Sequence, residues 1–179
     1  MLPMKAAVIK SAWISSRALR TGNCRMSDNE EIVSQAGIMF ENGFNCAQSV
    51  FANLTKKSNL DTEIALKIAT PFGGGVSHTG NICGAVTGAL MGLGAYFGND
   101  IPDREIKYNN YAIGRKFIDS FTEEFGNISC PLLLGLDLSN EEESQIAHEK
   151  DLFHTKCLLY VTVATRIACE IIDEVEKSS

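Results

Sequence analysis

The sequence predicts an all-α fold, a single-domain bundle of six or seven helices. Apolar residues recur every three or four positions along most of the chain, whereas alternating strand patterns are scarce and no hairpin signal stands out. Capping residues, glycines and prolines separate the apolar stretches. With 179 residues, 45% of them hydrophobic, the chain is long enough for one domain with a core and short for two.

Three of the predicted helices lie in the first 70 residues. Gly43 ends the first and Pro71 stops the third, because glycine accepts the left-handed conformation of a helix end and proline lacks the N–H that a continuing helix needs. The predicted bounds and N-terminal capping residues are 27–42 with Ser27 and Glu30, 46–57 with Asn45, and 62–70 with Asp61.

The remaining helices follow a glycine-rich loop at residues 73–80. Pro102 suits the first turn of the second of these helices, Gly126 closes that helix, and a loop that holds Cys130 and Pro131 comes next. The predicted bounds are 83–97, 102–125, a short acidic helix opened by Ser139 and Glu142, and 155–176.

The charge distribution separates the N-terminus from the rest of the chain. The net charge is −6 at pH 7, yet residues 1–27 hold five basic residues and no acidic one, which leaves −11 on the remainder. Phosphate binding needs clustered Lys and Arg, so this balance argues against a nucleic-acid partner. No apolar run reaches the roughly 20 residues that a membrane span needs. We therefore expect a soluble protein without a membrane span, in the cytoplasm rather than exported.

Residues 1–26 are predicted to form a basic N-terminal extension, and residues 27–179 the helical four-cysteine domain. The extension lacks the continuous apolar h-region and the twin-arginine pair of export signals. A native N-terminal helix is one alternative, and an upstream extension of the true reading frame, with Met26 as the natural start, is another. We favour the last, because "MSDNEEIV" is typical of the beginning of a protein and contains the capping residues of a helix.

Four of the six cysteines are candidates for one shared site. Cys24 lies in the N-terminal extension, and Cys169 falls mid-helix among apolar residues and is expected in the core. The others lie at predicted helix starts or, for the third, directly before a proline: Cys46, Cys83, Cys130 and Cys157. The N–H groups and the dipole of a helix start favour thiolate, the form that metals and redox partners bind. The chain has no C-x-x-C pair, which excludes zinc ribbons and thioredoxin-like motifs.

Four short segments resemble the C_GCAxxG_C_C family of redox-active proteins, which is named for one cysteine, a C-G-A-x-x-G run and two further cysteines. The segments are "GFNCAQSV", "CGAVTG", "FGNISCPLL" and "CLLYVTVA". They place the motif on Cys46, on residues 83–88, on Cys130 and on Cys157, and the similarity covers roughly residues 30–175. The resemblance implies a redox group, with an iron–sulfur cluster as the usual proposal, and a link to electron-transfer components. It implies no settled reaction.

Three functions are compatible with these cysteines. The first is an iron–sulfur cluster on four thiolates, for electron transfer or redox sensing, with an electron-transfer protein or an oxidoreductase as partner. The second is a metal-free thiol–disulfide protein in which two of the four cysteines cycle. The third is a structural zinc site, or buried cysteines in a helical interaction protein. The chain contains no G-x-S-x-G or H-E-x-x-H motif, and a homo-oligomer is compatible with each function.

Glycines line the predicted helix that Cys83 opens. Gly84, Gly88 and Gly92 lie four residues apart on one face, and each costs about 1 kcal/mol of helix stability relative to alanine. Such a face favours close helix packing, and Gly84 and Gly88 are also candidates for direct cofactor contact. The N–H groups of the loop at 73–80 are potential donors to cluster sulfurs or an anion. Two nearby histidines are expected to be exposed, with a ligand or proton-donor role as the alternative: His78 and His154.

A chain that begins at Met26 is expected to keep its fold, because the basic extension is predicted to pack little against the helical domain. Thermal unfolding followed by circular dichroism, with the full chain as reference, tests this expectation. A truncated chain that fails to fold, or that melts many degrees lower, would show that the extension is an integral part of the domain.

Overall fold

The computed structural model describes residues 26–178, so all but the last residue of the predicted N-terminal extension, and with it Cys24, lies outside the described residues. The longer helices are α2 (Met26–Glu41), α3 (Cys46–Leu54), α4 (Thr62–Ala69), α6 (Gly84–Phe97), α7 (Arg104–Phe125), α9 (Glu141–Glu149) and α10 (Leu158–Lys177). The shorter elements are α5 (Gly73–His78), α8 (Cys130–Leu134), two 3₁₀ turns (Thr55–Lys57 and Thr70–Phe72) and a π-helical turn (Phe153–Cys157).

The all-α prediction is confirmed. Between residues 26 and 178 there is no strand, only one isolated antiparallel bridge between Ile82 and Ser129. Two predicted helix caps are confirmed as well: the side chain of Asn45 accepts a hydrogen bond from an N–H of α3, and that of Asp61 accepts one from an N–H of α4. No helix in the described range is long and apolar enough to cross a membrane.

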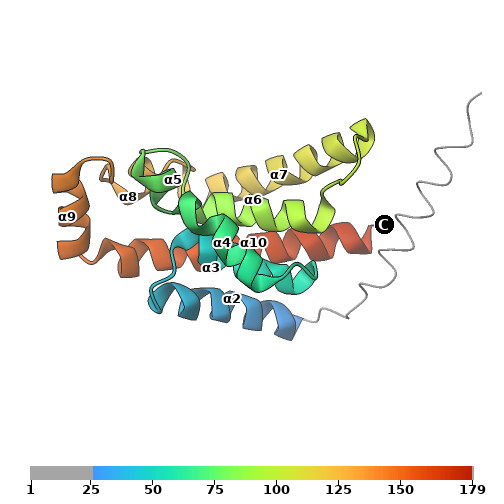
Figure 1. Ribbon diagram of the computed structural model, residues 1–179, viewed down its shortest axis with the longest axis horizontal. Coiled ribbons are helices and arrows are strands. Elements are labelled where there is room, and N and C mark those ends of the chain that lie inside the picture. The colour runs from blue at the N-terminus through green and yellow to red at the C-terminus, as the bar shows by residue number, and fades with distance from the viewer. Residues whose placement is uncertain (1–25, 179) are drawn as a thin grey trace, which may run out of the picture.

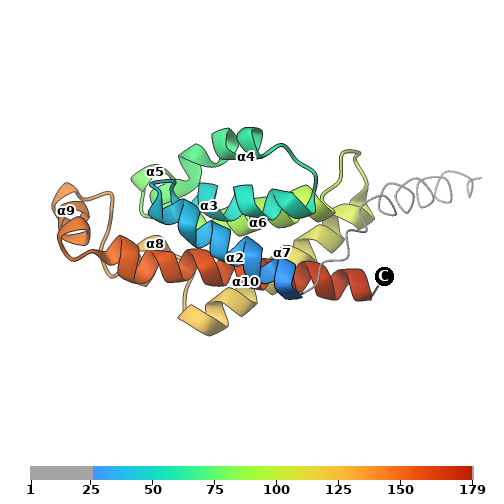
Figure 2. The same ribbon diagram turned by 90° about the horizontal axis from the view of Figure 1, so that it is seen from below.

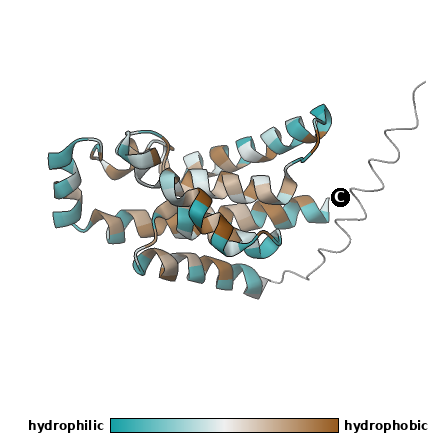
Figure 3. Cartoon of the chain, in the orientation of Figure 1, coloured by the Kyte–Doolittle hydropathy of each residue, from teal (hydrophilic) through white to brown (hydrophobic). Residues whose placement is uncertain are grey.

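Helix α10 is the centre of the bundle (Figures 1 and 2). Helices α2, α3, α6 and α7 all contact it, and α4 packs on the outside of α3. Helix α10 buries residues on more than one side, which explains why it can pack against several helices. They are Tyr160, Val161, Ala164, Thr165, Ile167, Ala168, Cys169, Ile171 and Ile172. Helices α5, α8 and α9 gather at the end of the bundle where α10 begins, and α9 is mostly polar (Figures 1 and 3).

The glycines of α6 let α3 approach it closely, as the sequence predicts. A Cβ atom on Gly88 would lie 2.7 Å from the carbonyl oxygen of Ala47, and one on Gly92 would lie 2.5 Å from the Leu54 side chain. A Cβ on Gly84 would collide with the sulfur of Cys46. The glycine face therefore packs against α3, and its first member lies directly against a motif cysteine.

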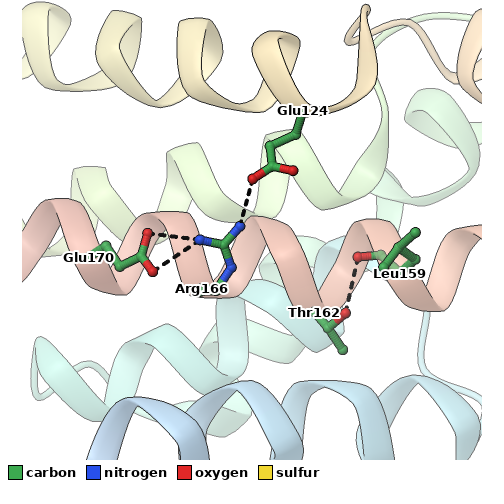
Figure 4. Close-up of polar contacts among 5 residues, drawn as sticks. All are labelled: Glu124, Leu159, Thr162, Arg166 and Glu170. Atoms are coloured by element: carbon green, nitrogen blue, oxygen red, sulfur yellow. Dashed lines mark hydrogen bonds and ion pairs between the residues drawn. The ribbon is translucent and has the colours of Figure 1, made fainter. Parts of the chain in front are cut away.

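Ion pairs join the outer segments to α10. The Lys57 ammonium lies 2.9 Å from the Asp173 carboxylate, and this pair is largely shielded from solvent. The side-chain amide of Asn29 in α2 donates to the same carboxylate at 2.7 Å. On the other side, Arg166 of α10 contacts Glu124 of α7 at 3.0 Å in a more exposed setting (Figure 4). Removing one member of the Lys57–Asp173 pair should cost more stability than removing one of the Arg166–Glu124 pair, because the remaining charge would be buried without a partner.

The starts of α2, α7 and α9 differ from the prediction. Helix α2 begins at Met26, so Ser27 lies inside it rather than before its first residue. Pro102 precedes α7 rather than entering its first turn, and Asp103 is the capping residue. Asn140, not Ser139, caps α9, and its side-chain oxygen accepts from two N–H groups of the first turn. The reason is that the N–H of Ser139 donates to the Asp137 side chain, which makes Ser139 part of the preceding turn.

The Gly88→Ala variant is expected to lose about 1–3 kcal/mol of unfolding free energy, because the added methyl group would force α3 away from α6. Gly94→Ala is the matched control in the same helix, since a Cβ there meets nothing within 4 Å. The control should gain up to about 1 kcal/mol from helix propensity alone. Urea unfolding of both variants measures the difference, and equal stabilities would contradict the close-packing interpretation.

Candidate functional site

The four motif cysteines line one cavity of about 140 Å³. Residues of α5 and α8, two elements at the same end of the bundle (Figure 1), contribute to its lining. The cysteines reach the cavity from α3, the start of α6, α8 and the π-helical turn. Most of the remaining lining is apolar: Phe40, Leu133, Leu134, Leu138, Phe153 and Tyr160. An apolar cavity of about 150 Å³ can hold a molecule as large as benzene, so this one has room for a small group.

Cys46 is the first residue of α3, directly after the cap. Asn45 and Gln48 form a reciprocal capping box, with their side chains accepting from each other's backbone N–H groups at 3.0 and 3.1 Å. Nearby backbone N–H groups, those of Gly74 and Gly84 among them, lower the pKa of the Cys46 thiol and oppose the larger effect of burial. Backbone N–H groups from two further segments therefore lie near this sulfur.

Cys83 and Cys130 are held side by side through their backbones. The N–H of Cys83 donates to the Ile128 carbonyl, and the N–H of Cys130 donates to the Asn81 carbonyl, both at 2.8 Å. Cys83 lies at the start of α6, as predicted, but as its N-cap, because the helix begins one residue later, at Gly84. Cys130 does not lie in a loop, as the sequence had indicated, but is the first residue of the short helix α8, because Pro131 fits the first turn of a helix.

Cys157 does not lie at a free helix start, which corrects the sequence-based expectation. It is the last residue of the π-helical turn, has helical backbone angles (φ −66°, ψ −35°) and leads directly into α10. The chain enters this turn earlier than the apolar pattern suggested, at Phe153. The dipole of a helix N-terminus therefore does not act on Cys157 as it does on a residue that begins a helix.

The glycine-rich segment forms a left-handed turn, which sequence analysis treated only as a loop. Five consecutive residues, 74–78, have positive φ, and they include Val76 at φ 59°. A positive φ is rare for a β-branched residue and marks local strain. The turn brings the N–H of Gly74 near the Cys46 sulfur, and a Cβ on Gly75 would lie 2.7 Å from the Cβ of Cys130. The run of three glycines at 73–75 was the available sequence signal.

Burial, not the helix dipole, dominates the electrostatics of the thiols. Loss of solvent raises the pKa of Cys130 from 9.0 to about 11 and that of Cys157 to about 12, and the charge of Cys46 adds to both shifts. The pKa values of Cys46 and Cys83 are raised by the same cause. The expectation that these positions favour thiolate is therefore wrong for the metal-free protein, in which the thiols are protonated at neutral pH.

The other candidate residues are placed as follows. His78 is exposed but lines the cavity, and His154 is exposed with its ring nitrogen 2.5 Å from the Asp151 carboxylate. Cys169 is fully buried in the core, as predicted. Gly84 and Gly88 pack against α3, and direct cofactor contact by either stays a prediction. All five cysteines in residues 26–178 are free thiols.

The cysteine sulfurs are not gathered as tightly as a loaded metal site would require. In the described part of the chain, no group of three or more His, Cys, Asp or Glu side chains is arranged to hold a metal ion. The four thiols surround the same cavity, and a bound metal or cluster would have to draw their sulfurs closer together. Convergence of all four sulfurs to within about 7 Å, as iron–sulfur bonds of about 2.3 Å require, stays a prediction for the loaded protein.

The metal-free thiols at Cys130 and Cys157 are expected to react slowly with alkylating reagents at neutral pH, because the thiolate is the nucleophile. Between pH 8 and 10 their rates should keep rising about tenfold per pH unit, whereas an ordinary thiol levels off near 9. Folding raises these two pKa values, so the free energy of unfolding also depends on pH. The contribution of the thiols is complete below pH 9 and is lost as the pH rises from 9 through 11 to 12. Site-resolved alkylation followed by mass spectrometry, with the urea-unfolded chain as control, measures the rates. Plateaus near pH 9 at both cysteines would contradict the burial effect.

Comparison with known proteins agrees with this cysteine pattern. No curated protein and no solved structure matches the chain significantly. The family model described as "Putative redox-active protein (C_GCAxxG_C_C)" matches residues 44–171, a stretch that includes all four cysteines of the cavity. Because this match covers more than half of the chain, the protein belongs to the C_GCAxxG_C_C family.

Proposed function

We propose that Cys46, Cys83, Cys130 and Cys157 hold an iron–sulfur cluster that serves electron transfer or redox sensing. The observation that carries this proposal is that four cysteines from four separate segments line one cavity. Four thiolates are the complete protein ligand set of a [2Fe–2S] or a [4Fe–4S] cluster. Such a cluster supplies reversible one-electron transfer when it is bound.

The surroundings of the thiols support this assignment. Backbone N–H groups that donate to cysteine sulfurs tune the potential of iron–sulfur centres, and the N–H groups of Gly74 and Gly84 favour negative charge at the Cys46 sulfur. Apolar side chains line most of the rest of the cavity and limit contact with water, and solvent exposure is a separate determinant of the potential. An electron-transfer protein or an oxidoreductase is the partner class that such a site would serve.

The raised thiol pKa values argue against the metal-free thiol–disulfide alternative. A thiol with a pKa of about 11 or 12 presents very little thiolate at neutral pH, and exchange begins with thiolate attack. A bound metal removes this obstacle, because coordination deprotonates a thiol outright. Buried thiols such as these are therefore better placed to bind a cation than to react as free nucleophiles. A structural zinc site uses the same donors and is distinguished by metal analysis.

Anaerobic purification is expected to yield a coloured protein with iron and acid-labile sulfide in equal amounts. The Cys46→Ser and Cys157→Ser variants should lose most of both, because each removes one thiolate from a half-buried position. Cys169→Ala is the control, since Cys169 lies in the core away from the motif, and it should keep iron and sulfide with a modest loss of stability. A visible spectrum with iron, sulfide and zinc analyses measures these outcomes. A wild-type protein that takes up no iron and sulfide on anaerobic reconstitution, or that holds stoichiometric zinc instead, would contradict the proposal.

A further inference from the structure

The short helix α8, which carries Cys130, depends on its neighbours for its position. It has only five residues, and an isolated helix of this length is not stable in water. Its first residue is Cys130, and Leu133 and Leu134 at its other end also line the cavity. The placement of Cys130 is therefore decided by the contacts that α8 makes at its two ends.

The start of α8 is attached to the segment of Cys83 by main-chain hydrogen bonds. Cys130 donates its N–H to Asn81, and Cys83 donates its N–H to Ile128. These bonds form around the bridge between residues 82 and 129. Since they involve backbone atoms alone, they relate Cys130 to Cys83 without help from any side chain.

The other end of α8 is attached to the segment of Cys157 by two side chains. The Tyr160 hydroxyl donates to the Leu133 carbonyl at 2.8 Å, and the Lys156 ammonium donates to the Leu134 carbonyl at 2.9 Å. Both acceptors belong to the last turn of α8, where carbonyl groups lack partners within the helix. Lys156 and Tyr160 flank Cys157 in the sequence, one residue before it and three residues after it.

We propose that Tyr160 and Lys156 are positioning residues, which hold α8 against the segment of Cys157 so that the Cys130 and Cys157 thiols face the same cavity, from which a cluster can draw them together. This role rests on the proposed function of the four cysteines, but the attachment itself is a property of the metal-free chain. The backbone bonds set Cys130 against Cys83, and the two side chains set Cys130 against Cys157. These two hydrogen bonds fix the last turn of α8 to the segment of Cys157, where Leu134 also packs in an apolar cluster with Phe153 and Cys157.

Two substitutions remove these bonds with little change in packing. Tyr160→Phe keeps the ring, whose contact with Phe125 has a centroid separation of 4.9 Å, and deletes only the hydroxyl. Lys156→Met keeps a long aliphatic side chain and deletes the charged donor. Matched controls are Tyr108→Phe and Lys150→Met, which alter an exposed tyrosine on α7 and an exposed lysine at the end of α9.

Site-resolved alkylation of the metal-free full chain with iodoacetamide tests the attachment. Cys130, only 8% exposed, should react about fivefold faster in Tyr160→Phe and about tenfold faster in Lys156→Met, because each lost bond increases the fraction of chains with α8 displaced. Cys169, fully buried in the core, should keep its rate in every variant. An unchanged Cys130 rate would overturn the proposal, as would a parallel rise at Cys169, which would indicate a general loss of stability.

A second measurement tests the role toward a cluster. After anaerobic reconstitution with iron and sulfide, the two variants should show broadened or shifted electron paramagnetic resonance signals and an altered midpoint potential, and the two controls should not. Signals and potentials identical to wild type would overturn the positioning role. If the wild-type chain takes up no iron, the proposed function fails by itself, and the alkylation rates still decide whether Tyr160 and Lys156 hold α8.

Discussion

The close contact between α3 and α6 is the constraint on which the cysteine site depends. Gly84 leaves room for the Cys46 sulfur, and Gly88 leaves room for the backbone of α3 one turn further on. A side chain at either position would separate the two helices, and with them Cys46 and Cys83. The cost of glycine within a helix, about 1 kcal/mol each, is offset by packing that no larger residue permits.

The second constraint is the competition between desolvation and the helix dipole. A helix N-terminus stabilises a negative charge by about 0.3–1 kcal/mol in an ordinary setting. The rise in the pKa of Cys130 from 9.0 to about 11 corresponds to about 3 kcal/mol in the opposite direction, and loss of solvent is its largest cause. The effect of desolvation is therefore larger than that of the helix dipole at this site, and the thiols stay protonated until a cation displaces the protons.

The sequence was sufficient to predict the helices and to single out the cysteines that share the cavity, but not their local surroundings. Helical periodicity and the caps at Asn45 and Asp61 are encoded within a few residues, so they could be recognised directly. The protonation state of the thiols could not be predicted from the sequence, because their burial depends on segments that lie far apart in the chain. The helical placement of Cys130 and the π-helical turn that ends at Cys157 likewise depend on how α8 and α10 pack.

The left-handed turn at residues 74–78 opposes the chirality of the amino acids from which it is made. Its backbone is nearly the mirror image of a right-handed helix, a form that costs each residue with a Cβ about 1–2 kcal/mol. Val76, Ser77 and His78 all bear that cost, so the turn would not form in a free peptide. Two hydrogen bonds to neighbouring residues stabilise the turn. The Ser77 hydroxyl donates to the Pro71 carbonyl at 2.7 Å, and the Asn81 N–H donates to the Gly75 carbonyl at 3.1 Å. D-amino acids would favour this backbone conformation, which makes chemical synthesis with D-residues at 76–78 a means of separating the shape of the turn from its strain.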